Sequence, residues 1–147
     1  MYKKVLVPLD GSKVAETALR HMRMLSKAGL IGELVILKVV EMPAPVAMPM
    51  AVEEGFDFSG YEDIYFKEAK KYIQGVESQL KSEGIKVKSE TILGRAVSTI
   101  LEYQKENNID LIIMATHGHS GVTKFLLGSV ANKVVQSSQA PVLLVRA

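Results

Sequence analysis

The sequence contains no cysteine, and this absence excludes disulfide bonds and thiolate metal sites. It is typical of proteins of the reducing cytoplasm, which is the compartment that we expect. The sequence also lacks any apolar run of about 18 residues, so we expect no transmembrane helix. The apolar run at the N-terminus ends at Asp10, which is too early for a signal peptide.

An excess of charge of either sign is also missing. The chain has 18 Lys and Arg residues against 16 Asp and Glu residues, which gives a net charge of +2 at pH 7. This excess is too small to indicate binding to nucleic acid or to an anionic membrane. The tyrosines and phenylalanines are scattered, without the pattern that stacks RNA bases. We therefore expect no nucleic-acid or membrane partner.

Apolar residues are plentiful. They make up 48% of the 147 residues, a content that is typical of a folded chain and enough for one domain with a sizeable core. No internal repeat, low-complexity tract or shift in composition marks a boundary. The sequence therefore predicts a single domain over residues 1–147.

Short apolar runs alternate with helical patterns along the chain. We predict strands at residues 5–7, 33–40, 85–93, 111–115 and 142–145, and helices at about 14–25, 62–83, 94–107 and 128–137. In the second helix, the spacing predicts that six residues face inward: Ile64, Ala69, Tyr72, Ile73, Val76 and Leu80. The strand runs are mostly continuous rather than alternating, which is typical of parallel strands covered on both faces. The pattern predicts an α/β, Rossmann-like fold: an open, mainly five-stranded parallel sheet with helices on both faces.

One loop candidate for a functional site follows the predicted strand at 111–115, where residues 114–130 read MATHGHSGVTKFLLGSV. Ligands of parallel sheets bind at the carboxyl ends of strands, at the point where the strand order reverses. Gly118 and Gly121 let the backbone approach a ligand, and Gly128 and Ser129 open a helix whose N-terminus can bind phosphate. A glycine-rich connector before an ordinary capped helix is the alternative.

The spacing in this stretch fits neither a Walker A motif nor a Gly-x-Gly-x-x-Gly fingerprint. We expect Val122, Phe125, Leu126 and Leu127, in the apolar part of the stretch, to pack it against the core. The second loop candidate is the segment 8–12, Pro-Leu-Asp-Gly-Ser, after the first strand. Ser12 is expected to cap the following helix.

Several segments together resemble the universal stress protein family over essentially the whole chain. They are the runs at 5–12, 36–39, 94–96, 110–118, 127–130 and 140–145. The nucleotide-binding branch of that family is similar in carrying Gly-x-x-Gly, nine residues, then Gly-Ser or Gly-Thr. Here this frame falls on Ala115, Gly118, Gly128 and Ser129, so alanine replaces the first glycine.

The resemblance implies a role for each matching residue in ATP binding. Pro8, Leu9 and Asp10 would line one wall, with the Asp10 carboxylate on a ribose hydroxyl. Val39 would contact adenine, and Met114 and Ala115 would pack on base and sugar. Gly118, Gly128, Ser129 and Val130 would offer N–H or O–H groups to the phosphates. Mg²⁺ or Mn²⁺ would be held largely by phosphate oxygens and water, without a protein metal site.

No catalytic residue is expected. His117 is explained by structure, because it matches a family position beside the second glycine, and His119 is expected to face solvent. A turn-forming or helix-capping role for Asp10 remains the alternative to ribose binding.

We therefore interpret the chain as an ATP-binding regulatory or stress-response protein with slow or no hydrolysis. One alternative is a dimeric scaffold of the same family that binds no nucleotide. Less favoured are an enzyme that hydrolyses or transfers nucleotides, and a receiver-type domain, since the acidic residue after the first strand is Asp10 alone.

The family's strand order, 3-2-1-4-5, would place the fifth strand at an edge of the sheet. Residues 142–146 have four apolar residues followed by Arg146, and an apolar edge left open invites pairing with another chain. We therefore expect a homodimer that pairs these strands. Capping of that edge within one subunit is the alternative.

Overall fold

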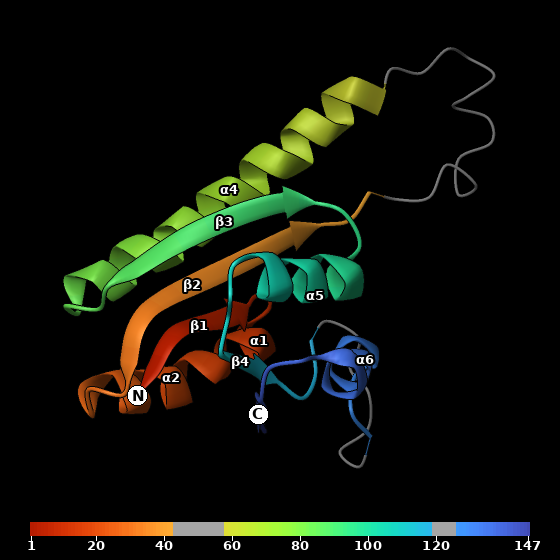
Figure 1. Cartoon of the computed structure of the whole chain (residues 1–147). Coiled ribbons are helices and arrows are strands. Elements are labelled where there is room, and N and C mark those ends of the chain that lie inside the picture. Colours follow the sequence, from red (N-terminus) through yellow and green to blue (C-terminus); the bar gives the residue numbers. More distant parts are fainter. Residues whose placement is uncertain (43–57, 119–125) are drawn as a thin grey trace.

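The computed structural model describes residues 1–42, 58–118 and 126–147 (Figure 1). Its strands are β1 (Tyr2–Pro8), β2 (Ile31–Val40), β3 (Val87–Leu93), β4 (Leu111–Ala115) and β5 (Val142–Val145). They form one sheet in the order β3-β2-β1-β4-β5, and each neighbouring pair is parallel. The predicted α/β fold and the strand order that the resemblance implied are confirmed.

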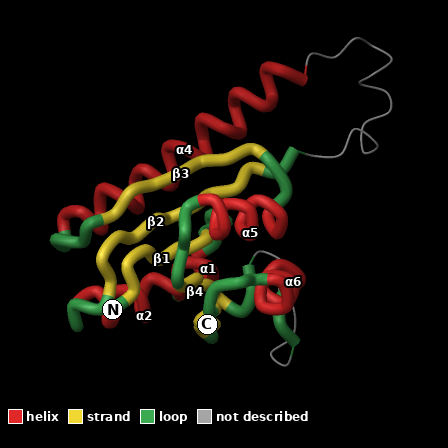
Figure 2. Tube along the Cα trace, viewed as in Figure 1, coloured by secondary structure: helices red, strands yellow, loops and turns green. Residues whose placement is uncertain are grey.

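The helices are α1 (Lys13–Glu16), α2 (Ala18–Lys27), α4 (Phe58–Ser82), α5 (Ala96–Glu106) and α6 (Ser129–Ser137). They lie on both faces of the sheet: α1, α2 and α4 cover one face, and α5 and α6 cover the other (Figure 2). Prolines at residues 43, 45 and 49 argue by sequence against a helix there, and this segment lies outside the described residues.

Two apolar clusters fill the spaces on the two sides of the sheet. In β1, Val5 and Val7 belong to the cluster under α1, α2 and α4, whereas Leu6 belongs to the cluster under α5 and α6. All three side chains are fully buried. A strand that is covered on both faces has no side for polar residues, so its sequence reads as a continuous apolar run.

The first helical segment is interrupted. Ser12 caps α1, as expected, because its Oγ accepts a hydrogen bond from the Ala15 N–H at 3.1 Å. The segment breaks at Thr17, whose Oγ1 donates to the Val14 carbonyl at 2.6 Å. Such a bond to a carbonyl one turn earlier competes with the helical pattern. The helix continues as α2.

Helix α4 begins at Phe58, earlier than expected, and its N-terminal turns reach beyond the end of β3 (Figure 1). Ala69, Ile73 and Leu80 are buried, as their spacing predicted. The prediction that Ile64 faces inward is wrong, because 57% of this residue is exposed. The sheet does not extend under this part of the helix.

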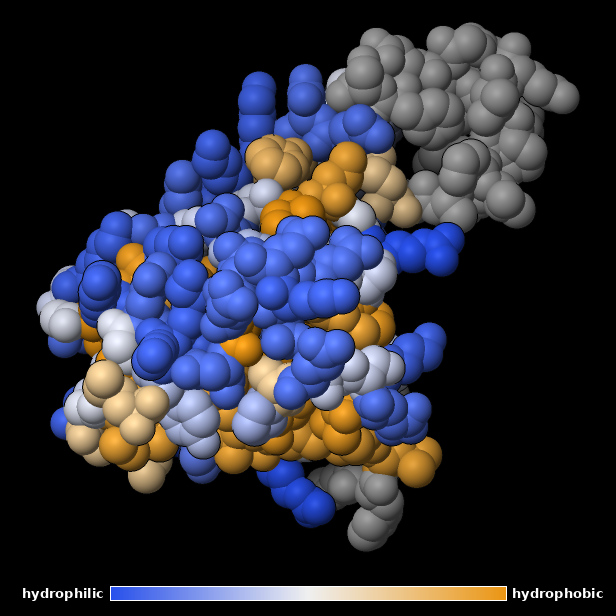
Figure 3. Space-filling view, viewed as in Figure 1, coloured by the Kyte–Doolittle hydropathy of each residue, from blue (hydrophilic) through white to orange (hydrophobic). Residues whose placement is uncertain are grey.

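The other edge of the sheet is formed by β5. Val145 is buried, and Val142, Leu143 and Leu144 are half-buried. In the space-filling view, hydrophobic atoms gather along the lower side of the molecule, near the C-terminus (Figure 3). This edge is therefore apolar as well as open in the described part of the chain.

Candidate functional site

A cavity of about 420 Å³ opens at the carboxyl ends of β1, β2 and β4, where the strand order reverses. All ten residues predicted for the site line it: Pro8, Leu9, Asp10, Val39, Met114, Ala115, Gly118, Gly128, Ser129 and Val130. They come from four separate parts of the chain. The structure brings them together, and their roles in binding stay predictions.

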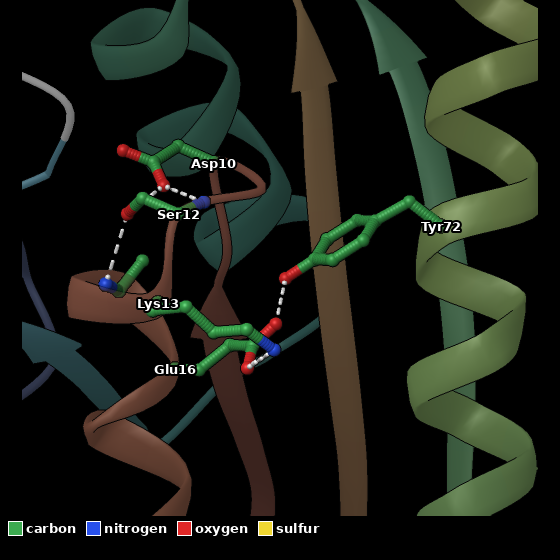
Figure 4. A network of polar contacts seen from close by, with 6 residues as sticks. Asp10, Ser12, Lys13, Glu16 and Tyr72 are labelled. Carbon is green, nitrogen blue, oxygen red and sulfur yellow. Dashed lines mark hydrogen bonds and ion pairs between the residues drawn. The ribbon is translucent and has the colours of Figure 1, made fainter.

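Asp10 is fixed at the start of the loop after β1. Its Oδ1 accepts hydrogen bonds from the Ser12 N–H at 2.9 Å and from the Ser12 hydroxyl at 2.6 Å (Figure 4). Asp10 therefore does form a local turn, as the alternative interpretation held. The turn does not exclude the ribose role, because a carboxylate can accept several hydrogen bonds and this one lines the cavity.

A second set of polar contacts ties α4 to α1 below this loop. The Tyr72 hydroxyl donates to Glu16 Oε1 at 2.8 Å, and Lys13 Nζ lies 3.3 Å from Glu16 Oε2 (Figure 4). Burial and the Glu16 carboxylate raise the pKa of Tyr72 well above its usual value, so the phenol stays a donor. These contacts link α4 to the helix that Ser12 caps.

Backbone hydrogen bonds of Thr116 hold the glycine-rich stretch to the start of α6 and to β5. The Thr116 carbonyl accepts a hydrogen bond from the Gly128 N–H at 2.7 Å, and the Thr116 N–H donates to the Val145 carbonyl at 3.0 Å. A Cβ on Gly128 would lie 3.0 Å from the Thr116 carbonyl oxygen. Gly128 has φ −58° and ψ 156°, an ordinary conformation, so close approach and not backbone freedom requires the glycine.

His117 closes the same stretch with both ring nitrogens. Nδ1 lies 3.0 Å from the Thr116 hydroxyl, and Nε2 bonds to the Leu126 carbonyl. A carbonyl only accepts, so Nε2 carries the proton and a neutral ring accepts from Thr116 at Nδ1. His117 thus holds the two ends of the stretch together, in agreement with the structural explanation.

The first backbone N–H groups of α6 lie at the cavity and make no hydrogen bond within the helix. The Gly128 carbonyl accepts from the Asn132 N–H at 2.9 Å, so the first-turn amides of Ser129 and Val130 precede the first intrahelical bond. The Gly128 N–H is bound to Thr116. Of the four residues predicted to donate to phosphate, Gly128 therefore provides space rather than its N–H in this conformation, and the roles of Gly118, Ser129 and Val130 stay predictions.

Ala115, in place of the motif's first glycine, is the final residue of β4, and only 6% of it is exposed. In the described parts of the chain, the one non-glycine residue with positive φ is Asn108. Ala115 is thus not strained. A glycine at this position would let a ligand approach the backbone more closely, and it would not be needed for a positive φ.

Two charged residues that sequence reasoning missed also line the cavity, Lys38 and Glu41. Glu41 Oε1 accepts from the Ala96 N–H at 2.6 Å and so caps α5 from the end of β2. Lys38 Nζ donates to the Val39 carbonyl at 3.2 Å. The one available signal was a charge near the carboxyl end of an apolar strand.

One prediction for the glycine-rich stretch is wrong, and others concern residues that the structure does not describe. Leu126 is 63% exposed and Leu127 is 39% exposed, so the prediction that they pin the stretch to the core is wrong. His119, Gly121, Val122 and Phe125 lie outside the described residues.

Within residues 1–42, 58–118 and 126–147, no three His, Cys, Asp or Glu residues are grouped so that they could hold a metal ion. No described helix is long and apolar enough to cross a membrane.

A model of the universal stress protein family matches residues 1–146. The chain is 30% identical to Universal stress protein MJ0531 of Methanocaldococcus jannaschii, over 99% of this chain and 83% of that protein. The solved structure of MJ0577, from the same organism, is similar with a TM-score of 0.83 and 32% identity, over 100% of this chain and 97% of that one. A universal stress protein in complex with cAMP shares the fold, with a TM-score of 0.61 and 22% identity over 99% and 97% of the chains.

Proposed function

Because the chain belongs to the universal stress protein family, we propose that it binds an adenine nucleotide, ATP, and acts as a regulatory or stress-response protein. One observation carries this proposal. The Asp10 carboxylate, the Gly118 backbone and the first turn of α6 converge on one cavity of about 420 Å³. A volume of this size is typical of small-molecule sites.

In this proposal the cavity is divided among the parts of the ligand. The base lies against Val39 and Met114, and the ribose hydroxyls donate to Asp10. The phosphates lie at the N-terminus of α6, where unpaired N–H groups and the helix dipole favour an anion. The related protein in complex with cAMP supports an adenine ligand for this fold.

We propose slow or no hydrolysis, and one feature of the lining residues supports it. Both ring nitrogens of His117 are engaged by Thr116 and Leu126, so this histidine is not available as a general base. We expect Mg²⁺ or Mn²⁺ to be bound mainly by phosphate oxygens and water, because the cation has few carboxylates to reach. Such an ion would neutralise phosphate charge.

We further propose a single-domain, cytoplasmic homodimer that pairs its β5 strands through residues 142–146. The support is the position of β5 at the edge of the sheet and its half-buried apolar side chains. Antiparallel pairing of two such edges would satisfy their N–H and C=O groups and cover their side chains.

A dimeric scaffold that binds no nucleotide is the second candidate. The observation that favours it is Ala115, which replaces the first glycine of the binding motif. The two candidates differ in whether purified protein carries or takes up adenine nucleotide. An enzyme that hydrolyses or transfers nucleotides is the less favoured third.

The test is native mass spectrometry of the purified chain, followed by calorimetry with ATP and Mg²⁺. We expect bound nucleotide and a micromolar Kd. Gly128→Val should abolish binding, because the side chain meets Thr116 and His117 and shifts the start of α6. The proposal is wrong if no adenine nucleotide gives heat or a thermal shift with the unmodified chain.

A further inference from the structure

Lys38 is an unusual residue for its place. Apart from Glu33 near the start of β2, it is the one charged side chain of that strand, and it lies near the carboxyl end. It is half-buried and lines the cavity beside Val39. A long charged side chain that is half removed from water at a cavity wall needs a physical reason.

The reason begins with the way β1 leaves the sheet. The Leu9 N–H donates to the Leu37 carbonyl at 2.8 Å, and the chain then turns away at Gly11, which has φ +92°. The next carbonyl of β2 on this side, that of Val39, accepts its bond from Lys38 Nζ at 3.2 Å instead. The Lys38 side chain lies along the turn, since its Cε is 4.0 Å from the position of a Cβ on Gly11.

The ammonium also lies in the field of two carboxylates. Burial lowers the pKa of Lys38, while the nearby carboxylates of Asp10 and Glu41 act in the opposite direction. Both of these acidic residues line the cavity. Among the described lining residues, Lys38 is the one Lys or Arg, so its ammonium is the positive charge that offsets two negative ones.

We propose that Lys38 is a specificity-determining residue that sets how the cavity discriminates among ligands by their number of phosphate groups. The inference rests on the proposed nucleotide binding. Without the ammonium, a polyanionic ligand would enter a cavity whose remaining fixed charges are the carboxylates of Asp10 and Glu41. A neutral nucleoside would meet the same walls without this repulsion.

The size of the effect follows from Coulomb's law. One positive charge at about 10 Å in a water-like dielectric changes the affinity about twofold for each phosphate charge. The effects multiply along the series adenosine, AMP, ADP and ATP. For ATP the loss on removing the charge should reach roughly tenfold at low salt and shrink at high salt, because ions screen the interaction.

The experiment measures Kd by calorimetry for these four ligands, in EDTA and at low and high salt. Lys38→Met removes the charge and keeps the length of the side chain, and Lys38→Arg keeps the charge. Lys105→Met is the matched control, because it removes the same charge from the last turn of α5, at the end of that helix away from the cavity. Circular dichroism and thermal melting check that each variant is folded.

We expect the Lys38→Met loss to grow with phosphate number, Lys38→Arg to bind like the unmodified chain, and Lys105→Met to show no such trend. An equal loss for all four ligands, or no loss, would overturn the inference while leaving nucleotide binding intact. If the unmodified chain binds none of the four, the proposed function fails, and this inference fails with it.

Discussion

Gly118 lies directly against the carboxylate of Asp10. A Cβ added to Gly118 would overlap Oδ2 of Asp10 and would lie 3.3 Å from its Cγ. The two residues follow different strands, β1 and β4, which are neighbours in the sheet. The parallel arrangement of these strands therefore places Asp10, the residue predicted to bind ribose, against Gly118, the second position of the predicted nucleotide-binding motif.

Substitution of Gly118 by alanine should push these two loops apart. We expect Gly118→Ala to lower the free energy of unfolding by about 1 kcal/mol, at the low end of overpacking costs, because the atoms that it meets belong to one side chain. It should also weaken ATP binding, because the Asp10 carboxylate has to move. Chemical denaturation and calorimetry measure the two effects. In the Asp10→Ala background, which lacks the opposing carboxylate and its bonds to Ser12, the same Gly118→Ala change should cost much less stability.

The matched control is Gly75→Ala, in the middle of α4, where an added Cβ meets nothing within 4 Å. Alanine is favoured over glycine inside a helix, so this variant should gain up to about 1 kcal/mol. Equal stability losses in the two variants would contradict the role of the Asp10 contact.

Ala115→Gly should bind ATP as well as the unmodified chain, or better. The alanine is unstrained in β4, so the change removes a methyl group from the cavity wall without relieving a backbone strain. The expected cost is in stability, about 0.5–1 kcal/mol, because glycine weakens a strand. Calorimetry and denaturation separate the two effects. A clear loss of affinity would show that the methyl group contacts the ligand.

Tyr103 should make the fold sensitive to high pH. Burial, with smaller contributions from Glu90 and Glu33, raises its pKa to about 12 from 10.0. The folded state therefore holds the phenol proton more tightly than the unfolded state, so this contribution to stability is present below pH 10 and is lost as pH rises towards 12. The free energy of unfolding, measured across this range, should fall less steeply in Tyr103→Phe.

At neutral pH the same variant should be as stable as the unmodified chain or slightly more stable. The Tyr103 hydroxyl is buried and has no partner at hydrogen-bond geometry within the described residues, so its removal breaks no such bond. The group nearest to pairing with it is the Glu90 carboxylate, which also helps to raise its pKa. A loss above about 1 kcal/mol would mean that the hydroxyl has a partner after all.

A proline at an outward-facing position of β5 tests the proposed dimer without breaking the hydrogen bonds between β5 and β4. The Pro141 and Val145 carbonyls accept from β4, so alternation points the N–H and C=O groups of Val142 and Leu144 away from β4. Val142→Pro removes an outward N–H, so it should yield monomers in sedimentation while keeping the fold. Leu143→Pro, which removes an inward N–H, should instead destabilise the chain. An unmodified chain that sediments as a monomer at high micromolar concentration would remove the dimer proposal.

Much of the candidate site was accessible from the sequence, because its residues lie in short segments with their own local signals. Asp10 and Ser12 follow an apolar strand, and Gly128 and Ser129 precede a helical pattern. The parallel-sheet rule then places such loops at one edge. The error at Ile64 shows the limit of the same reasoning, since a helical pattern gives the side that faces inward but not where the sheet beneath it ends.

The sequence by itself determined the fold class, the positions of the strands and the family, because apolar periodicity and loop motifs are properties of neighbouring residues. Only the tertiary structure decided which groups remain for a ligand. In the folded chain, the Gly128 N–H is bound to Thr116 and both ring nitrogens of His117 are engaged. Lys38 donates to the Val39 carbonyl and lies near the carboxylates of Asp10 and Glu41. These relationships join atoms across strands and loops, and their distances depend on how the elements pack, which no local pattern encodes.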